Sequence, residues 1–270
     1  MKPAPFAYKR ARSTEEAVAL LGGKEARLLA GGQSLIATLN MRLSAPALLI
    51  DINGIGGLDA IAVKGGTLEI GALTRHAAAE RSEIIARHAP LLTRALPHIG
   101  HPAIRNRGTL GGSLAFADPA AELPACLLAL DGEVEATGPT GNRRIEAQEF
   151  FKGLFETALE PGELITAVTF PIPQSAAYEK FPHPASRYAV VGVFVARTAE
   201  RGVRVGVTGA GPCAFRATAF EQTLLKNFTA DALKGVSIPA AGLNSDIHAG
   251  ADYRAHLVGV LARRAVAAAA

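Results

Sequence analysis

The sequence predicts an α+β fold, with two N-terminal αβ subdomains followed by a C-terminal lobe of sheet and helices. Strand-like and helix-like runs alternate over residues 13–171 of the 270-residue chain. A proline-containing segment then precedes two valine-rich runs and two helical runs. Apolar residues make up 49% of the chain and charged residues 19%, a balance that favours a packed core over disorder.

The first helix is predicted from its capping residues. Ser13 and Glu16 form a capping box ahead of the apolar run 17–21. Gly22 and Gly23 follow that run and end the helix.

Periodicity predicts the other elements of the first 171 residues. Long runs at helical spacing are assigned to helices, and short apolar or alternating runs to strands. We expect strands at 27–30, 48–52, 67–74, 133–137 and 163–171, a helix at 123–130, and one or two helices over 74–98, interrupted near Pro90.

Residues 171–186 contain four prolines and few regular apolar repeats. This composition predicts a domain boundary or a structured crossing loop. After it, runs 187–197 and 203–211 read as two strands that pair across the turn at 199–202. Helices are expected at 217–226 and 253–270.

Charge and composition exclude two classes of partner. The formal net charge of +4 is spread along the chain, and aromatic residues are only 6%. A nucleic-acid surface needs a basic stripe with stacking aromatics, so no nucleic-acid partner is expected. The N-terminal residues lack the apolar core of a signal peptide, and no apolar run reaches about 18 residues, the length that spans a bilayer. We therefore expect a cytoplasmic protein without a transmembrane segment.

The chain has two cysteines, Cys126 and Cys213, which lie far apart in sequence. They form no CxxC pair, and an iron–sulfur cluster takes four protein ligands. Free thiols are expected, and no metal site is predicted in this chain.

Two glycine pairs carry similar neighbours. Gly31 and Gly32 follow an apolar run and precede Ser34, and a second pair lies between Thr109 and Ser113. Glycine has no Cβ and accepts positive φ, so consecutive N–H groups can converge on an anion. One such pair is usually a turn, but two similar pairs favour a shared anionic ligand such as the pyrophosphate of a dinucleotide.

Other motifs give weaker predictions. GAGPCA at 209–214 has the spacing of a dinucleotide fingerprint, but its proline lacks an N–H donor and no acidic residue follows at the required distance. His98 and His101 lack a third metal ligand. Asp118 and Glu122 have no identifiable nucleophile or histidine partner, so hydrolysis has little support.

Several motifs, taken in their order along the sequence, resemble those of the flavoprotein subunit of the molybdenum hydroxylases. This family includes the medium subunit of aerobic carbon monoxide dehydrogenase and the FAD domain of xanthine dehydrogenase. The resemblance covers essentially the whole chain. It rests on AGGQSL (30–35) with LLIDI (48–52), IRNRGTLGGSLAFADPAAELP (104–124), FPIP (170–173), YEKF (178–181), GAGPCAFRATAFE (209–221) and the tail at 246–265.

The resemblance implies a fold and a cofactor site. It implies an FAD-binding domain of the vanillyl-alcohol-oxidase (PCMH) type over 1–173, with subdomains of about 1–54 and 55–173. A domain like the C-terminal one of carbon monoxide dehydrogenase flavoproteins would span 174–270. The residues implied to bind FAD are Ala30, Gly31, Gly32, Gln33, Ser34, Leu35, Ile36, Ala37, Thr109, Gly111, Gly112, Ser113, Glu122, Ile165 and Lys180.

The resemblance also divides these residues by role. Both glycine loops would wrap the pyrophosphate, and Glu122 would lie near the ribose or adenine. Ile165 and Lys180 would lie close to the flavin. No side-chain acid, base or nucleophile is required, because the cofactor performs the redox chemistry.

The implied function is that of an FAD-binding subunit in a heterotrimer, as a dimer of heterotrimers. A small subunit with 2Fe–2S clusters would deliver electrons, and a large molybdopterin subunit would hydroxylate the substrate, which this chain does not specify. Gln33 replaces the histidine typical of carbon monoxide dehydrogenases, and the loop 183–192 differs from that of xanthine dehydrogenases. The external acceptor therefore stays open between NAD, a quinone, a cytochrome and dioxygen. The alternatives are a stand-alone FAD oxidase of the same fold and a non-catalytic nucleotide-binding module.

Overall fold

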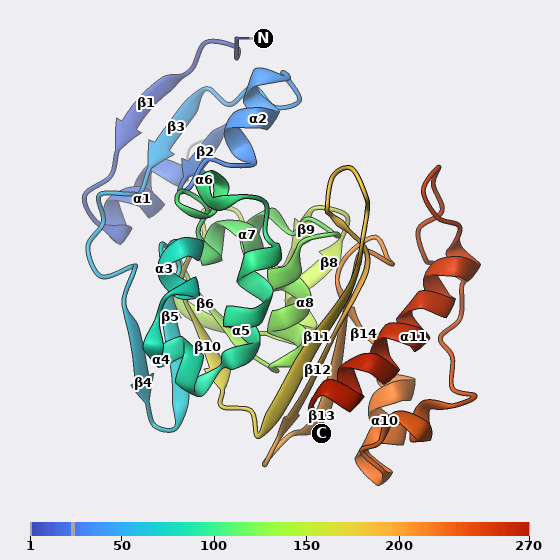
Figure 1. The fold of residues 1–270 in the computed structure, drawn as a ribbon. Coiled ribbons are helices and arrows are strands. Elements are labelled where there is room, and N and C mark those ends of the chain that lie inside the picture. The colour runs from blue at the N-terminus through green and yellow to red at the C-terminus, as the bar shows by residue number, and fades with distance from the viewer. Residues whose placement is uncertain (1, 23–24, 270) are drawn as a thin grey trace.

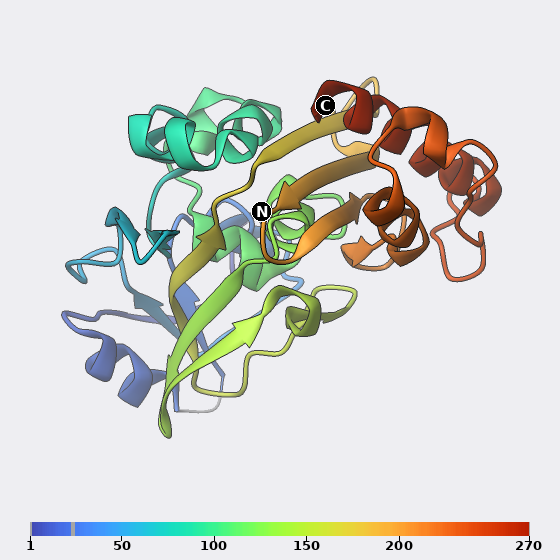
Figure 2. The same cartoon turned by 90° about the horizontal axis from the view of Figure 1, so that it is seen from below.

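The structure is a computed structural model that describes residues 2–22 and 25–269. A small N-terminal subdomain lies beside a central region of sheet and helices, and a second sheet with its own helices follows at the C-terminal end (Figure 1). Turning the molecule by 90° shows the long strands of the two larger sheets running past the central helices (Figure 2).

The N-terminal subdomain is a parallel three-stranded sheet in the order β1-β3-β2. The predicted strands at 27–30 and 48–52 are confirmed as β2 and β3. The first strand was missed because all four of its residues are exposed and show no alternation. The elements are β1 (Ala7–Arg10), α1 (Thr14–Leu21), β2 (Ala26–Leu29), α2 (Leu35–Asn40) and β3 (Leu48–Asp51).

Helix α1 begins as its capping box predicts. The Ser13 hydroxyl accepts a hydrogen bond from the Glu16 N–H at 3.2 Å. The Glu16 carboxylate accepts from the N–H of Arg12, one residue before the expected donor, at 2.8 Å. Gly22 caps the C-terminal end, and Gly23 lies outside the described residues.

The central sheet is antiparallel, in the order β4-β5-β10-β6-β7. The predicted strands at 67–74, 133–137 and 163–171 are its three inner strands. The two edge strands were missed because they are short or polar and bury few side chains. The strands are β4 (Ile61–Lys64), β5 (Thr67–Gly71), β6 (Glu133–Gly138), β7 (Gly141–Glu146) and β10 (Leu164–Pro171).

The predicted interruption near Pro90 is confirmed, and a second one was missed. Pro90 is the first residue of α5, where the missing N–H costs no helical hydrogen bond. Ser82 caps α4 by accepting from the N–H of Ile85 at 3.3 Å, which separates α4 from α3. The segments here are α3 (His76–Glu80), α4 (Glu83–His88), α5 (Pro90–Ala95), η1 (Leu96–His98), α6 (Pro102–Arg105), α7 (Leu110–Phe116), α8 (Glu122–Ala129), α9 (Ala147–Phe150), β8 (Phe151–Gly153) and β9 (Glu156–Thr157).

The C-terminal lobe is a four-stranded antiparallel sheet in the order β11-β12-β13-β14, as expected for a sheet with helices. Helices α5 and α8 pack on one face, and α10 and α11 on the other (Figure 1). The helices predicted at 217–226 and 253–270 are confirmed, the second as far as Ala269, because residue 270 lies outside the described residues. The elements are β11 (Ser175–Pro182), β12 (Ala189–Thr198), β13 (Gly202–Thr208), β14 (Phe215–Arg216), α10 (Thr218–Lys226), η2 (Ala230–Leu233) and α11 (Ala251–Ala269).

Residues 171–186 were expected to form a domain boundary or a crossing loop, but the middle of this segment is a strand. Ser175–Pro182 forms β11, an eight-residue strand paired with β12. Its prolines are compatible with a strand because Pro171 ends the preceding strand and Pro182 ends β11, which is an edge strand. The sequence SAAYEKFP shows no regular alternation of apolar residues, so this segment carries no local signal of a strand.

The core crosses the junction between the central region and the C-terminal lobe. Phe194 and Ala196 of β12 pack into the same cluster as α8 and β10, whereas Val193 and Val195 face α10 and α11. This alternation is the period-two pattern of a strand buried on both faces. Every residue of α8 is buried. Among the described residues, no helix is long and apolar enough to cross a membrane.

Candidate functional site

Both glycine loops line one large cleft. Its volume is about 1090 Å³, slightly above the usual range of about 300–1,000 Å³ for small-molecule and cofactor sites. The N-terminal subdomain, α7, α8, β10 and the loop after β11 all contribute to its walls. The walls of the cleft thus include residues more than 150 positions apart in the sequence, such as Gly31 and Tyr188.

The first glycine loop carries free donors. The backbone N–H groups of residues 31–34 find no acceptor among the described residues. Gly32 has a φ of +73°, a conformation that L side chains rarely adopt. Consecutive unpaired N–H groups on a cleft wall form a concave anion site, so this loop has the chemistry predicted for it.

The second glycine loop is a capped helix start rather than a second set of free donors. The Thr109 hydroxyl accepts from the Gly112 N–H at 3.2 Å, and the Thr109 carbonyl accepts from the Ser113 N–H at 3.0 Å. The Gly111 N–H donates to Ala72 at 2.8 Å. These N–H groups are already satisfied within the protein, so the Ser113 hydroxyl on the cleft wall is the simpler donor from this loop.

The two loops touch each other through backbone. A Cβ on Gly31 would overlap the carbonyl oxygen of Arg107 and lie 2.9 Å from the Cα of Gly108. A Cβ on Gly112 would lie 2.6 Å from the Thr109 hydroxyl. Side chains at these positions would force the loops apart or displace the helix cap. The absence of Cβ atoms is therefore a requirement of the site's geometry.

Glu122 and Lys180 form a buried ion pair on the cleft wall. Their Oε1 and Nζ atoms are 2.5 Å apart, and the side chains are 6% and 4% exposed. Burial raises the pKa of the Glu122 carboxyl, and the nearby Lys180 ammonium opposes that shift. The Tyr178 hydroxyl lies 3.4 Å from the same carboxylate oxygen. The resemblance assigned these two residues to different parts of the cofactor, and the structure shows that they contact each other on the cleft wall.

Three histidines also line the cleft, of which the sequence pointed to His98 and His101 only as an incomplete metal site and did not point to His76. His76 is 4% exposed, and its Nε2 lies 2.9 Å from the carbonyl oxygen of Thr109. His98 packs edge-on against Tyr178 at 5.3 Å, and burial together with Lys180 lowers its pKa. His101 lies on the wall nearby. No local motif marks His76, because its partner is 33 positions away.

Of the residues predicted to hold a cofactor, all line the cleft except Ile36 and Ala37, which lie on α2. The weaker candidate Asp118 also lines it, and burial raises the pKa of its carboxyl. GAGPCA, the weak dinucleotide fingerprint, does not line the cleft and forms the connection between β13 and β14. Among the described residues, no group of three metal-ligating side chains exists. Cys126 and Cys213 are free, the first buried and the second partly exposed.

Comparison with known proteins decides the family. The family model for the FAD-binding domain in molybdopterin dehydrogenase matches residues 4–173. The chain belongs to this family. The expected α+β fold with a PCMH-type FAD domain is confirmed, and the chain is an FAD-binding subunit of a molybdenum hydroxylase-type oxidoreductase.

Individual relatives cover nearly the whole chain. The alpha subunit of the 6-hydroxypseudooxynicotine dehydrogenase complex of Paenarthrobacter nicotinovorans is 41% identical over 99% of this chain and 95% of its own length. The carbon monoxide dehydrogenase medium chain of Afipia carboxidovorans is 36% identical over 98% of this chain and 97% of its own. In the structure of reconstituted CO dehydrogenase from Oligotropha carboxidovorans, one chain matches with a TM-score of 0.93 at 35% identity, covering 100% of this chain and 99% of that one.

Proposed function

We propose that this chain holds FAD in the large cleft and relays electrons from the 2Fe–2S clusters of a small partner subunit to an external acceptor. The observation that carries the proposal is the row of unpaired N–H groups at residues 31–34 on the wall of a cleft of about 1090 Å³. A pyrophosphate carries two negative charges and several acceptor oxygens, which match such a row of donors.

The chain's own residues fit the cofactor at three points. Residues 31–34 and the Ser113 hydroxyl would bind the pyrophosphate oxygens. Glu122 and Lys180 would together face a polar part of the cofactor, and Ile165 would supply an apolar wall close to the flavin. Bound FAD would supply the conversion between one-electron transfer and a two-electron acceptor. The protein's contribution is binding, orientation and electrostatics.

The partner subunits follow from chemistry that this chain lacks. A 2Fe–2S cluster takes four ligands, usually cysteines, and the chain has two cysteines. The proposal includes a small subunit that carries the clusters and, from the resemblance to the molybdenum hydroxylases, a large molybdopterin subunit, arranged as a dimer of heterotrimers in the cytoplasm. The relatives support the presence of partner subunits, since they are named as a subunit of a dehydrogenase complex and as the medium chain of a dehydrogenase. Residues 1–173 and 174–270 are proposed as the two domains, and the family match over 4–173 supports that division.

The test is a titration of the purified chain with FAD, followed by absorption and flavin fluorescence. We expect one FAD to bind per chain, with the visible bands of an oxidised flavin and no iron by metal analysis. A chain that stays colourless in excess FAD contradicts the proposal.

A second arm distinguishes the stand-alone oxidase. If the chain is a subunit, substrates of the complex will reduce its flavin only after both partner subunits are added. Reduction of the flavin by such a substrate in the isolated chain would favour the oxidase instead.

A further inference from the structure

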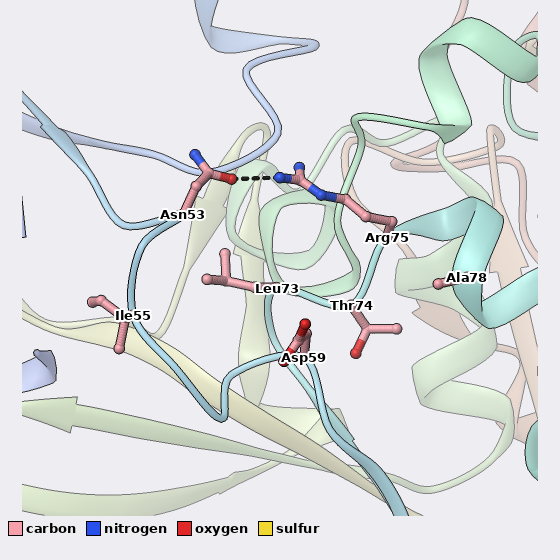
Figure 3. A pocket seen from close by; sticks show the side chains of 7 residues that line it. All are labelled: Asn53, Ile55, Asp59, Leu73, Thr74, Arg75 and Ala78. Atoms are coloured by element: carbon pink, nitrogen blue, oxygen red, sulfur yellow. Dashed lines mark hydrogen bonds between the residues drawn. The ribbon is translucent and has the colours of Figure 1, made fainter. Parts of the chain in front are cut away.

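A second, smaller cavity has Asn53, Leu73 and Arg75 among its lining residues. Its volume is about 140 Å³, and it shares Leu73 with the large cleft. Two of its lining residues are joined by a hydrogen bond, in which Asn53 Oδ1 accepts from Nη2 of Arg75 at 2.6 Å (Figure 3). Neither Asn53 nor Arg75 lines the large cleft, so neither is placed to touch a ligand there.

Asn53 is tied to the start of the first glycine loop. Its Nδ2 donates to the carbonyl oxygens of Leu29 at 3.2 Å and Ala30 at 2.9 Å. The same Nδ2 lies 2.7 Å from the Asp51 carboxylate, which also accepts from the Asn53 N–H at 2.8 Å. The amide orientation is thereby fixed, with the nitrogen toward the loop and the oxygen toward Arg75.

Arg75 is tied to the second glycine loop. Its Nη1 donates to the carbonyl oxygen of Arg107, the residue whose carbonyl abuts Gly31. Its backbone pairs with Thr109 in an antiparallel bridge. The flanking hydrogen bonds run from His76 N–H to the Gly108 carbonyl at 2.9 Å and from Leu110 N–H to the Thr74 carbonyl at 3.0 Å.

We propose that Asn53 and Arg75 form a brace that fixes the separation of the two glycine loops and thereby sets the affinity of the cleft for FAD. This inference rests on the proposed function, in which residues of both loops would bind the pyrophosphate of FAD. The brace runs from the carbonyls of Leu29 and Ala30, through the side chains of Asn53 and Arg75, to the carbonyl of Arg107. Both are positioning residues: they act by holding the backbone of the glycine loops and do not themselves line the large cleft.

The guanidinium of Arg75 is suited to joining two loops. A guanidinium is a planar fork with several fixed N–H donors, so one side chain can hold Asn53 and Arg107 at a set angle. Burial and the neighbouring Arg107 charge lower the pKa of Arg75, so this cation is kept at the junction against an electrostatic cost. A loop pair that is ordered before binding loses less entropy when a ligand arrives.

The test compares FAD binding by the wild-type chain, Arg75→Met, Asn53→Asp and the double variant. Arg75→Met keeps the length of the side chain and removes its donors. Asn53→Asp keeps an acceptor for Arg75 and removes the donor to Leu29 and Ala30. Each single change should weaken FAD binding about tenfold. Arg75→Met removes hydrogen bonds made by a charged group, whereas Asn53→Asp removes neutral hydrogen bonds and places a carboxylate beside that of Asp51. The double variant should be little worse than either.

Two further readouts separate positioning from general stability. The phosphorus resonances of bound FAD should shift in the brace variants, and amide exchange should speed up at residues 31–35 and 107–113. Arg201→Met is the matched control, because Arg201 also joins two elements, through ion pairs to Asp131 and Glu133, and lies outside the cleft. It should leave FAD affinity and the phosphorus spectrum unchanged.

The outcomes separate the two proposals. If the wild-type chain does not bind FAD, the proposed function fails and the brace fails with it. If the wild type binds but folded brace variants retain its affinity and phosphorus spectrum, the brace alone is overturned. If Arg75→Met does not fold, Asn53→Asp, which retains the Arg75 contact, carries the test. Equal losses in Arg201→Met would also overturn the brace.

Discussion

At the scale of single residues, His76 has two ring nitrogens in different surroundings. Nε2 faces the Thr109 carbonyl, so it must carry the proton, and Nδ1 is buried without a partner among the described residues. Burial lowers the pKa of His76 to about 4. The side chain is therefore neutral at pH 7 and supports the second loop as a hydrogen-bond donor.

This histidine predicts a pH dependence of stability. Between pH 6.5 and 4 the unfolded chain takes up a proton at His76 and the folded chain does not, so stability is lost as pH falls through that window. From pH 7 to pH 5 the loss from this residue should be about 2 kcal/mol. Urea unfolding of the wild type and His76→Gln at both pH values measures it. The glutamine can donate to Thr109 but does not titrate, and an equally steep loss in that variant would contradict the assignment.

At the scale of elements, the residues that cap the start of α7 also line the cleft. Thr109 caps the helix, and a Cβ on Gly112 would displace its hydroxyl. The N-cap position explains why a threonine precedes the glycine pair. It also explains why the N–H groups of the second loop are already paired. In the first loop the Ser34 side chain makes no capping hydrogen bond to α2.

Gly112→Val should therefore lose FAD and part of the helix cap together. We expect the purified variant to retain no FAD and to be less stable by about 1–2 kcal/mol, the usual contribution of an N-cap. Gly56→Val is the control, because a Cβ at Gly56 meets nothing within 4 Å and Gly56 does not line the cleft. FAD content and unfolding midpoints of both variants check the prediction. Wild-type FAD content in Gly112→Val would remove this loop from the site.

At the scale of the whole molecule, α8 holds the two larger sheets together. All its residues are buried, because the central region covers one side and β12 and β13 cover the other. Glu122 begins this helix and pairs with Lys180 from β11, so the ion pair spans the same junction. The cleft is complete only when both parts are present.

A chain cut after residue 173 should therefore not be a stable domain. Removing 174–270 uncovers the apolar face of α8 and leaves the Glu122 carboxylate without Lys180, and loss of one partner of a buried ion pair costs about 3–5 kcal/mol. We expect strong binding of a hydrophobic dye, aggregation on gel filtration and no FAD retention. The full-length chain is the control, and a monomeric, FAD-binding fragment would show that the first domain is independent.

The sequence by itself determined the class of fold, the family and the position of both glycine loops. These features are local: capping residues, periodicity and short motifs act over a few neighbours, so Ser13, Pro90 and Gly31 can be interpreted where they stand. Strand β11 was misread because local proline content outweighed a pairing with β12 that only the sheet supplies. Only the tertiary structure decided that Glu122 meets Lys180, that His76 supports Thr109, and that Asn53 and Arg75 join the loops. Each of these contacts links residues 22 to 58 positions apart, and their energies depend on burial and distance, which the order of residues along a chain does not contain.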